Sequence, residues 1–155
     1  MSEDDESWRD IRPVALAAVT RRAAGGTDGE ELLVFEYRDE EAEETFYRPP
    51  GGGVQFGEAA TDAAEREFRE ELGHEAAATE RLAVLENRFE FEGTAGHEYD
   101  LVYRVEPADE VYEREELVGV ETDGEEYRVT WKPLSAFRGE GTPPLYPEGL
   151  LDVLS

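Results

Sequence analysis

A run of glycines followed at once by a charged helix is the feature that most constrains this chain. Glycines such as those at 51–53 allow the backbone to approach a ligand closely and to adopt positive φ. From Ala59 to Gly73 the sequence is dense in Ala, Glu, Arg and Leu, which are good helix formers, so we predict a helix there. Gly73 stands where a left-handed C-terminal cap is expected. The sequence therefore predicts a helix that begins directly after a ligand-approaching loop.

The predicted helix distributes its charges unevenly around its axis. At about 100° per residue, one apolar stripe is formed by Ala60, Ala64, Phe68 and Leu72. The opposite, solvated face is expected to carry Asp62, Glu65 and Arg69. Three further glutamates lie at or just beyond the edge of the apolar stripe and are neighbours at i,i+3 and i,i+4 spacing, namely Glu67, Glu70 and Glu71.

Three like charges beside a buried face are costly unless a positive charge lies among them. Arg66 is one such charge, at i,i+4 from Glu70, but it cannot balance three carboxylates. A hard divalent cation with oxygen ligands could, and Mg²⁺ is the usual one beside phosphates. The alternative is a solvated acidic helix in a very acidic protein. The position of Glu67 and Glu71 beside the apolar stripe favours the metal site.

The spacing of these residues resembles a known family motif. From Gly52 the chain follows G-x5-E-x7-R-E-F-x-E-E-x-G-H, which is similar to the Nudix box G-x5-E-x7-R-E-U-x-E-E-x-G-U, where U is a bulky apolar residue. Eight of the nine defined positions match, and the exception is His74 at the last U. That position is expected to pack the chain as it leaves the helix, so the departure concerns packing more than chemistry.

The resemblance implies roles for individual residues. Metal ligands would be the carboxylates of Glu67, Glu70 and Glu71 and the backbone carbonyl of Gly51, with Mg²⁺ or Mn²⁺ as the cofactor. Arg66 would hold one carboxylate in place through a charge-assisted hydrogen bond. Glu58 would orient the loop and Arg66, or bind a second metal through water.

The general base is less sharply indicated, because in this family it often lies outside the box. Counted back from Trp131, Glu125 fits one family pattern, with Glu126 and Glu121 nearby. Glu98, beside His97 on a predicted strand, is the other candidate. For each of these the simpler alternative is a surface glutamate.

The order of predicted elements indicates a single α/β domain. Apolar or alternating stretches predict strands at 11–20, 31–38, 45–48, 81–92, 97–105, 117–120 and 127–131, with a bulge expected near Glu86-Asn87. A helical turn is expected at 134–137 and a short helix at 148–154. The fold class that follows is α/β, a Nudix-like α/β/α sandwich with a mixed β-sheet. Residues 1–10 are expected to be a disordered acidic arm, with the domain spanning 11–155.

Composition excludes several kinds of partner and chemistry. The chain has no cysteine, which rules out disulfides, thiolate metal sites and a Cys nucleophile. It carries 40 acidic and 15 basic residues, a net charge of −25, and should repel nucleic acid and anionic membranes. No signal peptide or spanning segment is evident, so a cytoplasmic protein is expected. The acidic, lysine-poor balance resembles proteins of salt-in halophiles, and the alternative is an acidic protein of ordinary cytosol.

The expected function is Mg²⁺-dependent hydrolysis of the pyrophosphate linkage in a nucleoside diphosphate joined to another moiety, X. The expected partner is thus a small-molecule nucleoside diphosphate derivative, and assembly as a homodimer is compatible with the sequence. One alternative is a non-catalytic Nudix-like module that senses a nucleotide sugar, although such modules usually lose box glutamates and this chain keeps them all. A second, RNA decapping, is disfavoured by the net charge.

Overall fold

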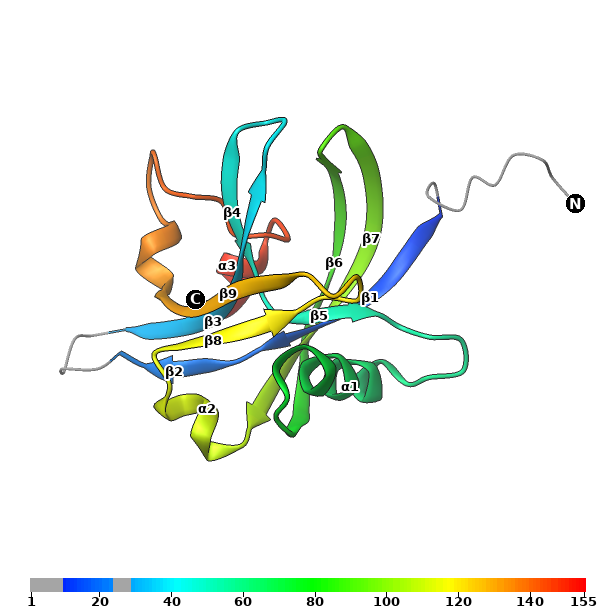
Figure 1. Cartoon of the computed structure of the whole chain (residues 1–155), viewed down its shortest axis with the longest axis vertical. Helices are drawn as coiled ribbons and strands as arrows, with labels where there is room; N and C mark the ends of the chain where they lie inside the picture. The colour runs from blue at the N-terminus through cyan, green and yellow to red at the C-terminus, as the bar shows by residue number, and fades with distance from the viewer. Residues whose placement is uncertain (1–9, 24–28) are drawn as a thin grey trace, which may run out of the picture.

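The computed structural model describes residues 10–23 and 29–155, which form two β-sheets with helices packed against them (Figure 1). The acidic arm expected over residues 1–10 lies outside the described residues, apart from Asp10. Its separation from a domain over 11–155 stays a prediction. Among the described residues, no helix is long and apolar enough to cross a lipid bilayer.

The first sheet is mixed, as predicted. Its strand order is β5-β1-β7-β6. Strand β1 runs parallel to β7, whereas β5 pairs with β1 and β6 with β7 in antiparallel fashion. The bounds are Gly51–Gly53 for β5, Ile11–Ala18 for β1, Thr94–Pro107 for β7 and Ala76–Phe91 for β6.

The second sheet is antiparallel and follows the order β2-β3-β9-β8, with β4 paired to the other part of β3. Its strands are β2 (Thr20–Arg22), β3 (Glu30–Asp39), β4 (Glu44–Arg48), β8 (Glu116–Val120) and β9 (Glu126–Pro133). The strand predicted over 11–20 therefore changes sheets: it leaves the first after Ala18 and joins the second at Thr20. A hydrogen bond from the Leu33 amide to the Val19 carbonyl, at 2.9 Å, continues the pairing across this step.

The central strands are buried on both faces, which confirms the layered α/β/α arrangement. Helix α1 (Ala60–Leu72) covers one face, where it packs against Ala15, Ala17 and Val19 of the β1 segment. The opposite face carries Val14, Leu16 and Ala18 and is covered by the 3-10 helix η3 (Leu134–Phe137) and by α3 (Leu150–Leu154). Because both faces are covered, β1 has the continuous apolar sequence typical of such strands.

Helix α1 matches its predicted bounds, and one expectation about its faces is corrected. Phe68 is completely buried, and Gly73 ends the helix with φ 73°, in the left-handed region. Glu65 was expected on the solvated face. Instead its Oε2 accepts a hydrogen bond from the backbone amide of Ala78 in β6, at 2.8 Å.

Two other local predictions are wrong. Strand β6 runs for 16 residues, and its irregularities lie between Ala78 and Glu80 and between Arg81 and Ala83, not near Glu86-Asn87. The region between β7 and β8, where the sequence predicted no element before residue 117, contains a short helix, α2 (Asp109–Glu113). His74 follows α1 and turns toward this helix, with its Nδ1 3.6 Å from the Glu110 carboxylate.

Two long hairpins, β3–β4 and β6–β7, extend side by side from the body of the protein, away from α1 and α2 (Figure 1). Residues of all four strands line a common cavity. The ends of the hairpins are joined, because Asp39 Oδ2 accepts a hydrogen bond from the Glu92 amide at 3.2 Å. The fold therefore places a partly open cavity beside the sheet that carries the glycine loop.

Candidate functional site

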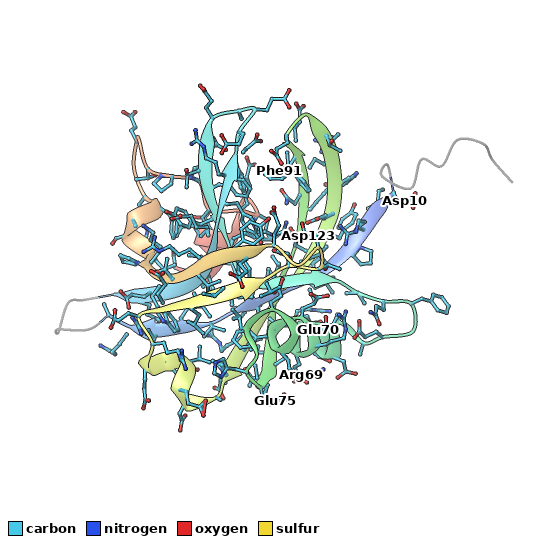
Figure 2. The ribbon with its side chains drawn as sticks, viewed as in Figure 1. Asp10, Arg69, Glu70, Glu75, Phe91 and Asp123 are labelled. Carbon is cyan, nitrogen blue, oxygen red and sulfur yellow. The ribbon has the colours of Figure 1, made fainter. Side chains whose placement is uncertain are left out.

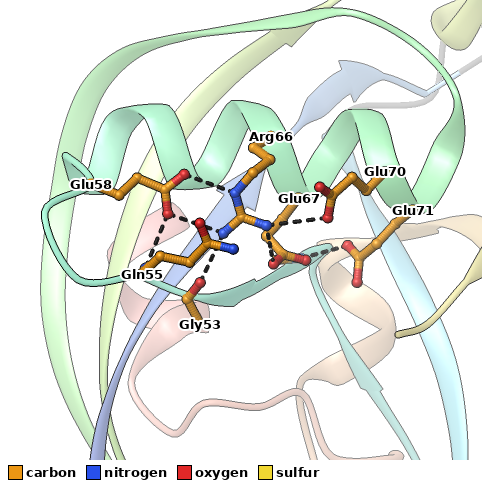
Figure 3. Close-up of polar contacts among 8 residues, drawn as sticks. Gly53, Gln55, Glu58, Arg66, Glu67, Glu70 and Glu71 are labelled. Atoms are coloured by element: carbon orange, nitrogen blue, oxygen red, sulfur yellow. Dashed lines mark hydrogen bonds and ion pairs between the residues drawn. The ribbon is translucent and has the colours of Figure 1, made fainter. Parts of the chain in front are cut away.

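Arg66 lies at the centre of the site and donates hydrogen bonds to several of its residues (Figure 3). Its Nε and Nη2 donate to the two oxygens of Glu58 at 2.7 and 3.0 Å. Its Nη1 donates to Glu67 at 2.8 Å and to Glu70 at 3.1 Å, and Nη2 also reaches the carbonyl of Gly53 at 3.0 Å. One guanidinium thus joins three box glutamates to the glycine loop.

Glu58 fixes the start of the helix. The hydrogen bonds from Arg66, supported by one from the Gln55 amide at 3.0 Å, hold the pKa of Glu58 below its usual range. Ala59, the N-cap residue of α1, makes no side-chain hydrogen bond to the first turn of the helix. The orientation of the loop relative to the helix therefore depends on Glu58 and Arg66.

Glu71 is the most deeply buried of the box carboxylates. Only 5% of its surface is exposed, and its Oε1 accepts a hydrogen bond from the Gly51 amide at 2.9 Å. Burial, followed by the charge of nearby Glu121, raises the pKa of Glu71 to about 10, against the lowering effect of the Gly51 amide. Burial is also the largest cause of the raised pKa of Glu67. Both carboxylates therefore lie where a cation would stabilise their charged form.

The glycines of β5 are required by close approach. A Cβ on Gly52 would lie 2.5 Å from Cδ of Glu67, so any side chain there would displace the carboxylate. A Cβ on Gly51 would collide with the backbone carbonyl of Ala15 in the neighbouring strand. The glycine loop thus places its backbone directly against the carboxylates of Glu67 and Glu71. Such close approach is expected if the loop and the carboxylates bind the same ligand.

The oxygen donors at this site suit a hard divalent cation such as Mg²⁺ or Mn²⁺. Glu67 and Glu71 are buried carboxylates with raised pKa values beside a glycine backbone, and this donor set fits such an ion. Within residues 10–23 and 29–155, no three acidic or histidine side chains already converge as a metal cage. One reason is that Glu70 bonds to Arg66 and keeps 57% of its side chain exposed.

The two candidate bases outside the box lie in different surroundings. Glu98 is buried, lines the cavity and is paired with Arg48 at 2.6 Å. Glu125 is exposed on the turn between β8 and β9, where it accepts a bond from the Tyr127 hydroxyl at 3.0 Å, and it does not line this cavity. The structure therefore brings Glu98, and not Glu125, to the cavity.

A third glutamate, Glu121, lies closer to the box than either candidate. It follows directly after β8, lines the cavity and contributes to the raised pKa of Glu71. Its Oε1 accepts a hydrogen bond from the hydroxyl of Tyr37 in β3. From the sequence, Glu121 was named only as a neighbour of the candidate base Glu125. Glu121 follows directly after the apolar strand and Glu125 does not, and this sequence signal would have distinguished the two glutamates.

The cavity, of about 440 Å³, extends from the carboxylates to the far ends of the two hairpins. At one end it is lined by Gly51, Gly52, Gly53, Glu67 and Glu121. At the other end, aromatic rings meet across the hairpins: Phe46 packs edge-on against Phe91 at 5.8 Å and against Tyr146 at 5.4 Å. Phe91 lies in the space between the hairpins (Figure 2). An acidic end of the cavity thus opens onto an aromatic one.

Comparison with known proteins identifies the family. The chain matches the NUDIX domain model over residues 12–148. No curated protein sequence matches it. The chain belongs to the Nudix family, and its complete set of box carboxylates makes it a Nudix-type hydrolase by class.

Solved structures share the fold at low sequence identity. A MutT NUDIX hydrolase from Burkholderia pseudomallei is 24% identical with a TM-score of 0.61, and the match covers 95% of this chain and 100% of that one. A UDP-X diphosphatase is 17% identical (TM-score 0.55; 94% and 61% covered). A NUDIX hydrolase from Nitrosomonas europaea is 14% identical (TM-score 0.54; 94% and 86% covered). These likenesses establish the fold.

Proposed function

We propose that the protein is a Mg²⁺- or Mn²⁺-dependent pyrophosphohydrolase that cleaves the pyrophosphate linkage of a nucleoside diphosphate joined to a further moiety, X. The observation that carries this proposal is that acidic and aromatic side chains line opposite ends of one cavity. Glu67 of the box and the glycine loop line one end of a cavity whose volume, about 440 Å³, is in the range of small-molecule sites. Aromatic side chains at the other end suit a flat base.

The residues that would hold the metal are Glu67, Glu70 and Glu71, with the carbonyl of Gly51. When bound, the ion would neutralise charge on the pyrophosphate oxygens and assist the attacking water. Arg66 keeps Glu67 in place through its bond at 2.8 Å. Glu70 must leave its contact with Arg66 to serve as a ligand, and its exposure gives it the freedom to do so.

A water molecule that attacks phosphorus must lose a proton, and we assign its acceptance to Glu121. This carboxylate lines the cavity near Glu71, and the Tyr37 hydroxyl holds one of its oxygens. Glu98 is the weaker candidate because Arg48 holds one of its oxygens at 2.6 Å. Glu125 would have to move from an exposed turn to reach the same cavity.

The net charge also bears on which partners the protein binds and on where in the cell it works. With a net charge of −25, a small-molecule nucleotide derivative with its cation is a better partner than nucleic acid or a membrane surface. We place the protein in the cytoplasm, and propose a cell with molar internal salt, because screening there would relieve its self-repulsion.

The test is a hydrolysis screen over nucleoside diphosphate derivatives in molar KCl with Mg²⁺, with Mn²⁺ and with excess EDTA. We expect a nucleoside monophosphate and a phosphorylated X as products, and only in the presence of the metal. Tight binding of a nucleotide sugar with no product would instead support the sensing module. Full turnover in EDTA would contradict the metal dependence.

A further inference from the structure

The floor of the cavity is a buried polar cluster that the proposed hydrolysis does not use. Asn87 and Glu98 face each other across β6 and β7, and both line the cavity with only 6% and 5% of their surfaces exposed. Asp100, two residues further along β7, is completely buried on the same face. Buried polar groups destabilise a fold unless they are paired. We call Asn87, Glu98 and Asp100 the polar floor.

The polar floor has more hydrogen-bond acceptors than donors. Its positive neighbour Arg48 uses one nitrogen, Nη2, for both carboxylates, at 2.6 Å from Glu98 and 3.3 Å from Asp100. The other oxygen of Asp100, Oδ2, is buried without a hydrogen-bond partner in the described part of the chain. Asp100 itself does not line the cavity, whereas Glu98 does, so a ligand that brings N–H groups to the Glu98 carboxylate would add donors to this cluster.

Aromatic side chains lie beside the polar floor. Phe89 is two residues from Asn87 on the same face of β6, and its ring occupies the space left by Gly96, where any Cβ would collide with it. Phe46 and Phe91 line the same cavity. A ligand that fits both features has a flat π face and N–H donors along its edge. A nucleobase has this form, whereas a sugar offers no π face.

The bases differ in the donors on their edges. Guanine presents two adjacent donors, a ring N–H and an amino group, whereas adenine and cytosine present an amino group beside a ring acceptor. Uracil presents one N–H between two carbonyl oxygens, which buried carboxylates would repel. The Glu98 carboxylate, an acceptor that lines the cavity, therefore discriminates most strongly between guanine and uracil.

We propose that Glu98 and Asn87, which line the cavity above the buried Asp100, bind the donor edge of the substrate's nucleobase, with Phe89 against its face, and that guanine nucleotides are preferred and uracil nucleotides disfavoured. The proposal rests on the proposed function for its hydrolytic consequences, but the binding of the base can be measured without hydrolysis.

The first test compares GDP-, ADP-, CDP- and UDP-glucose, which share the same X. We expect kcat/KM to be highest for GDP-glucose and at least about 10²-fold lower for UDP-glucose, because unpaired buried polar groups penalise a ligand without matching donors. Equal values, or a preference for UDP-glucose, would overturn the proposal.

The second test separates base recognition from a role of Glu98 as general base. Glu98→Gln replaces one acceptor oxygen by an N–H donor, so we expect the guanine-to-uracil ratio to fall by about 10-fold or more. A general base would lose the same factor with all four substrates. Glu86→Gln is the matched control, because Glu86 lies on the opposite face of β6 and bonds to His97 at 2.8 Å. An unchanged ratio in a folded Glu98→Gln variant contradicts the proposal.

Calorimetric titration of the unaltered protein with GMP and with UMP, in Mg²⁺ and molar KCl, keeps the two proposals apart and needs no variant to fold. Tighter binding of GMP by about 10-fold or more, with no hydrolysis of any nucleoside diphosphate derivative, would support base recognition and reject the proposed function. Hydrolysis of all four glucose derivatives with equal binding of GMP and UMP would reject base recognition and leave the hydrolase standing.

Discussion

The backbone amide of Gly51 donates a hydrogen bond to Oε1 of Glu71 at 2.9 Å, so strand β5 itself holds the last carboxylate of the box. The next residue, Gly52, leaves room for Glu67. Loop and helix therefore depend on each other: the loop orients the carboxylates, and the carboxylates require a loop without side chains.

Gly52→Ala is expected to abolish activity with little loss of stability. The added Cβ would lie 2.5 Å from Cδ of Glu67, and the end of that flexible side chain can move away, which would displace a proposed metal ligand. We expect kcat to fall by about 10²-fold or more while Tm changes by a few degrees at most. Gly51→Ala is the comparison, because its Cβ meets the Ala15 carbonyl and should lower Tm strongly. Similar kcat in Gly52→Ala and the unaltered protein would contradict the close-approach argument.

Glu71→Gln and Glu70→Gln are each expected to reduce kcat by at least about 10²-fold while the fold survives, because each removes the charge of a proposed metal ligand. The suitable control is Asp62→Asn, in the exposed first turn of α1. Glu65, on the face first expected to be solvated, is unsuitable because it bonds to the Ala78 amide. Equal losses at 62 and 71 would show that the position on the helix is irrelevant.

Arg66→Lys should weaken metal binding without removing the positive charge. A lysine ammonium cannot reproduce the planar fork that contacts Glu58, Glu67 and the Gly53 carbonyl together. We expect the Kd for Mn²⁺, measured by electron paramagnetic resonance, to rise by about 10-fold or more, as when partners of metal ligands are changed. Arg69→Lys, on an exposed part of the same helix, provides the control. Unchanged Mn²⁺ affinity in Arg66→Lys would refute the role of the fork.

The helix and the box could be predicted because their signals are local. The stripe of Phe68 and Leu72 repeats at the helical period, and Gly73 marks the end. The break between β1 and β2 could not be predicted, since Val14 to Val19 is one apolar run and only its packing between two sheets decides where it changes partner.

The candidate site outside the box was harder to predict because it depends on contacts between distant strands. The alternation of β7 leaves Glu98 and Asp100 on a buried face, whereas Tyr99 is 42% exposed. Arg48, which β4 brings against both carboxylates, compensates part of the cost of that burial. Glu121 likewise lies near Glu71 because β8, which it follows, pairs with β9. The separation of the two glutamates along the sequence gives no sign of this contact.

Asp100 should make the metal-free protein less stable as the pH rises. Burial is the largest cause of a pKa raised to about 7 from an ordinary 3.8, against the lowering effect of Arg48. The folded state therefore binds this proton more tightly than the unfolded state, and the contribution, full below about pH 4, is lost as the pH rises through 7. In urea titrations with EDTA, the free energy of unfolding relative to Asp100→Asn should fall by about 2 kcal/mol between pH 5 and 8. A difference independent of pH would contradict the shift.

Salt should stabilise this protein strongly. Its 40 acidic residues far outnumber its 15 basic ones, so the acidic residues repel one another, and they are distributed along the whole chain. The screening length is about 10 Å at 0.1 M salt and about 3 Å at 1 M, so only molar salt decouples neighbouring surface charges. We expect Tm to rise steeply between about 0.1 and 2 M KCl, and deletion of residues 1–10 to leave that rise in place.

Millimolar Mg²⁺ should add a separate increment to Tm, because it binds the folded site and not the unfolded chain. The double variant Glu67→Gln/Glu71→Gln removes two proposed ligands, and should therefore lose the Mg²⁺ increment. It removes only two of 40 acidic residues, and so should keep nearly the whole KCl slope. A Tm that is flat in KCl would refute adaptation to high salt, whereas a Mg²⁺ increment that persists in the double variant would place the cation elsewhere on the protein.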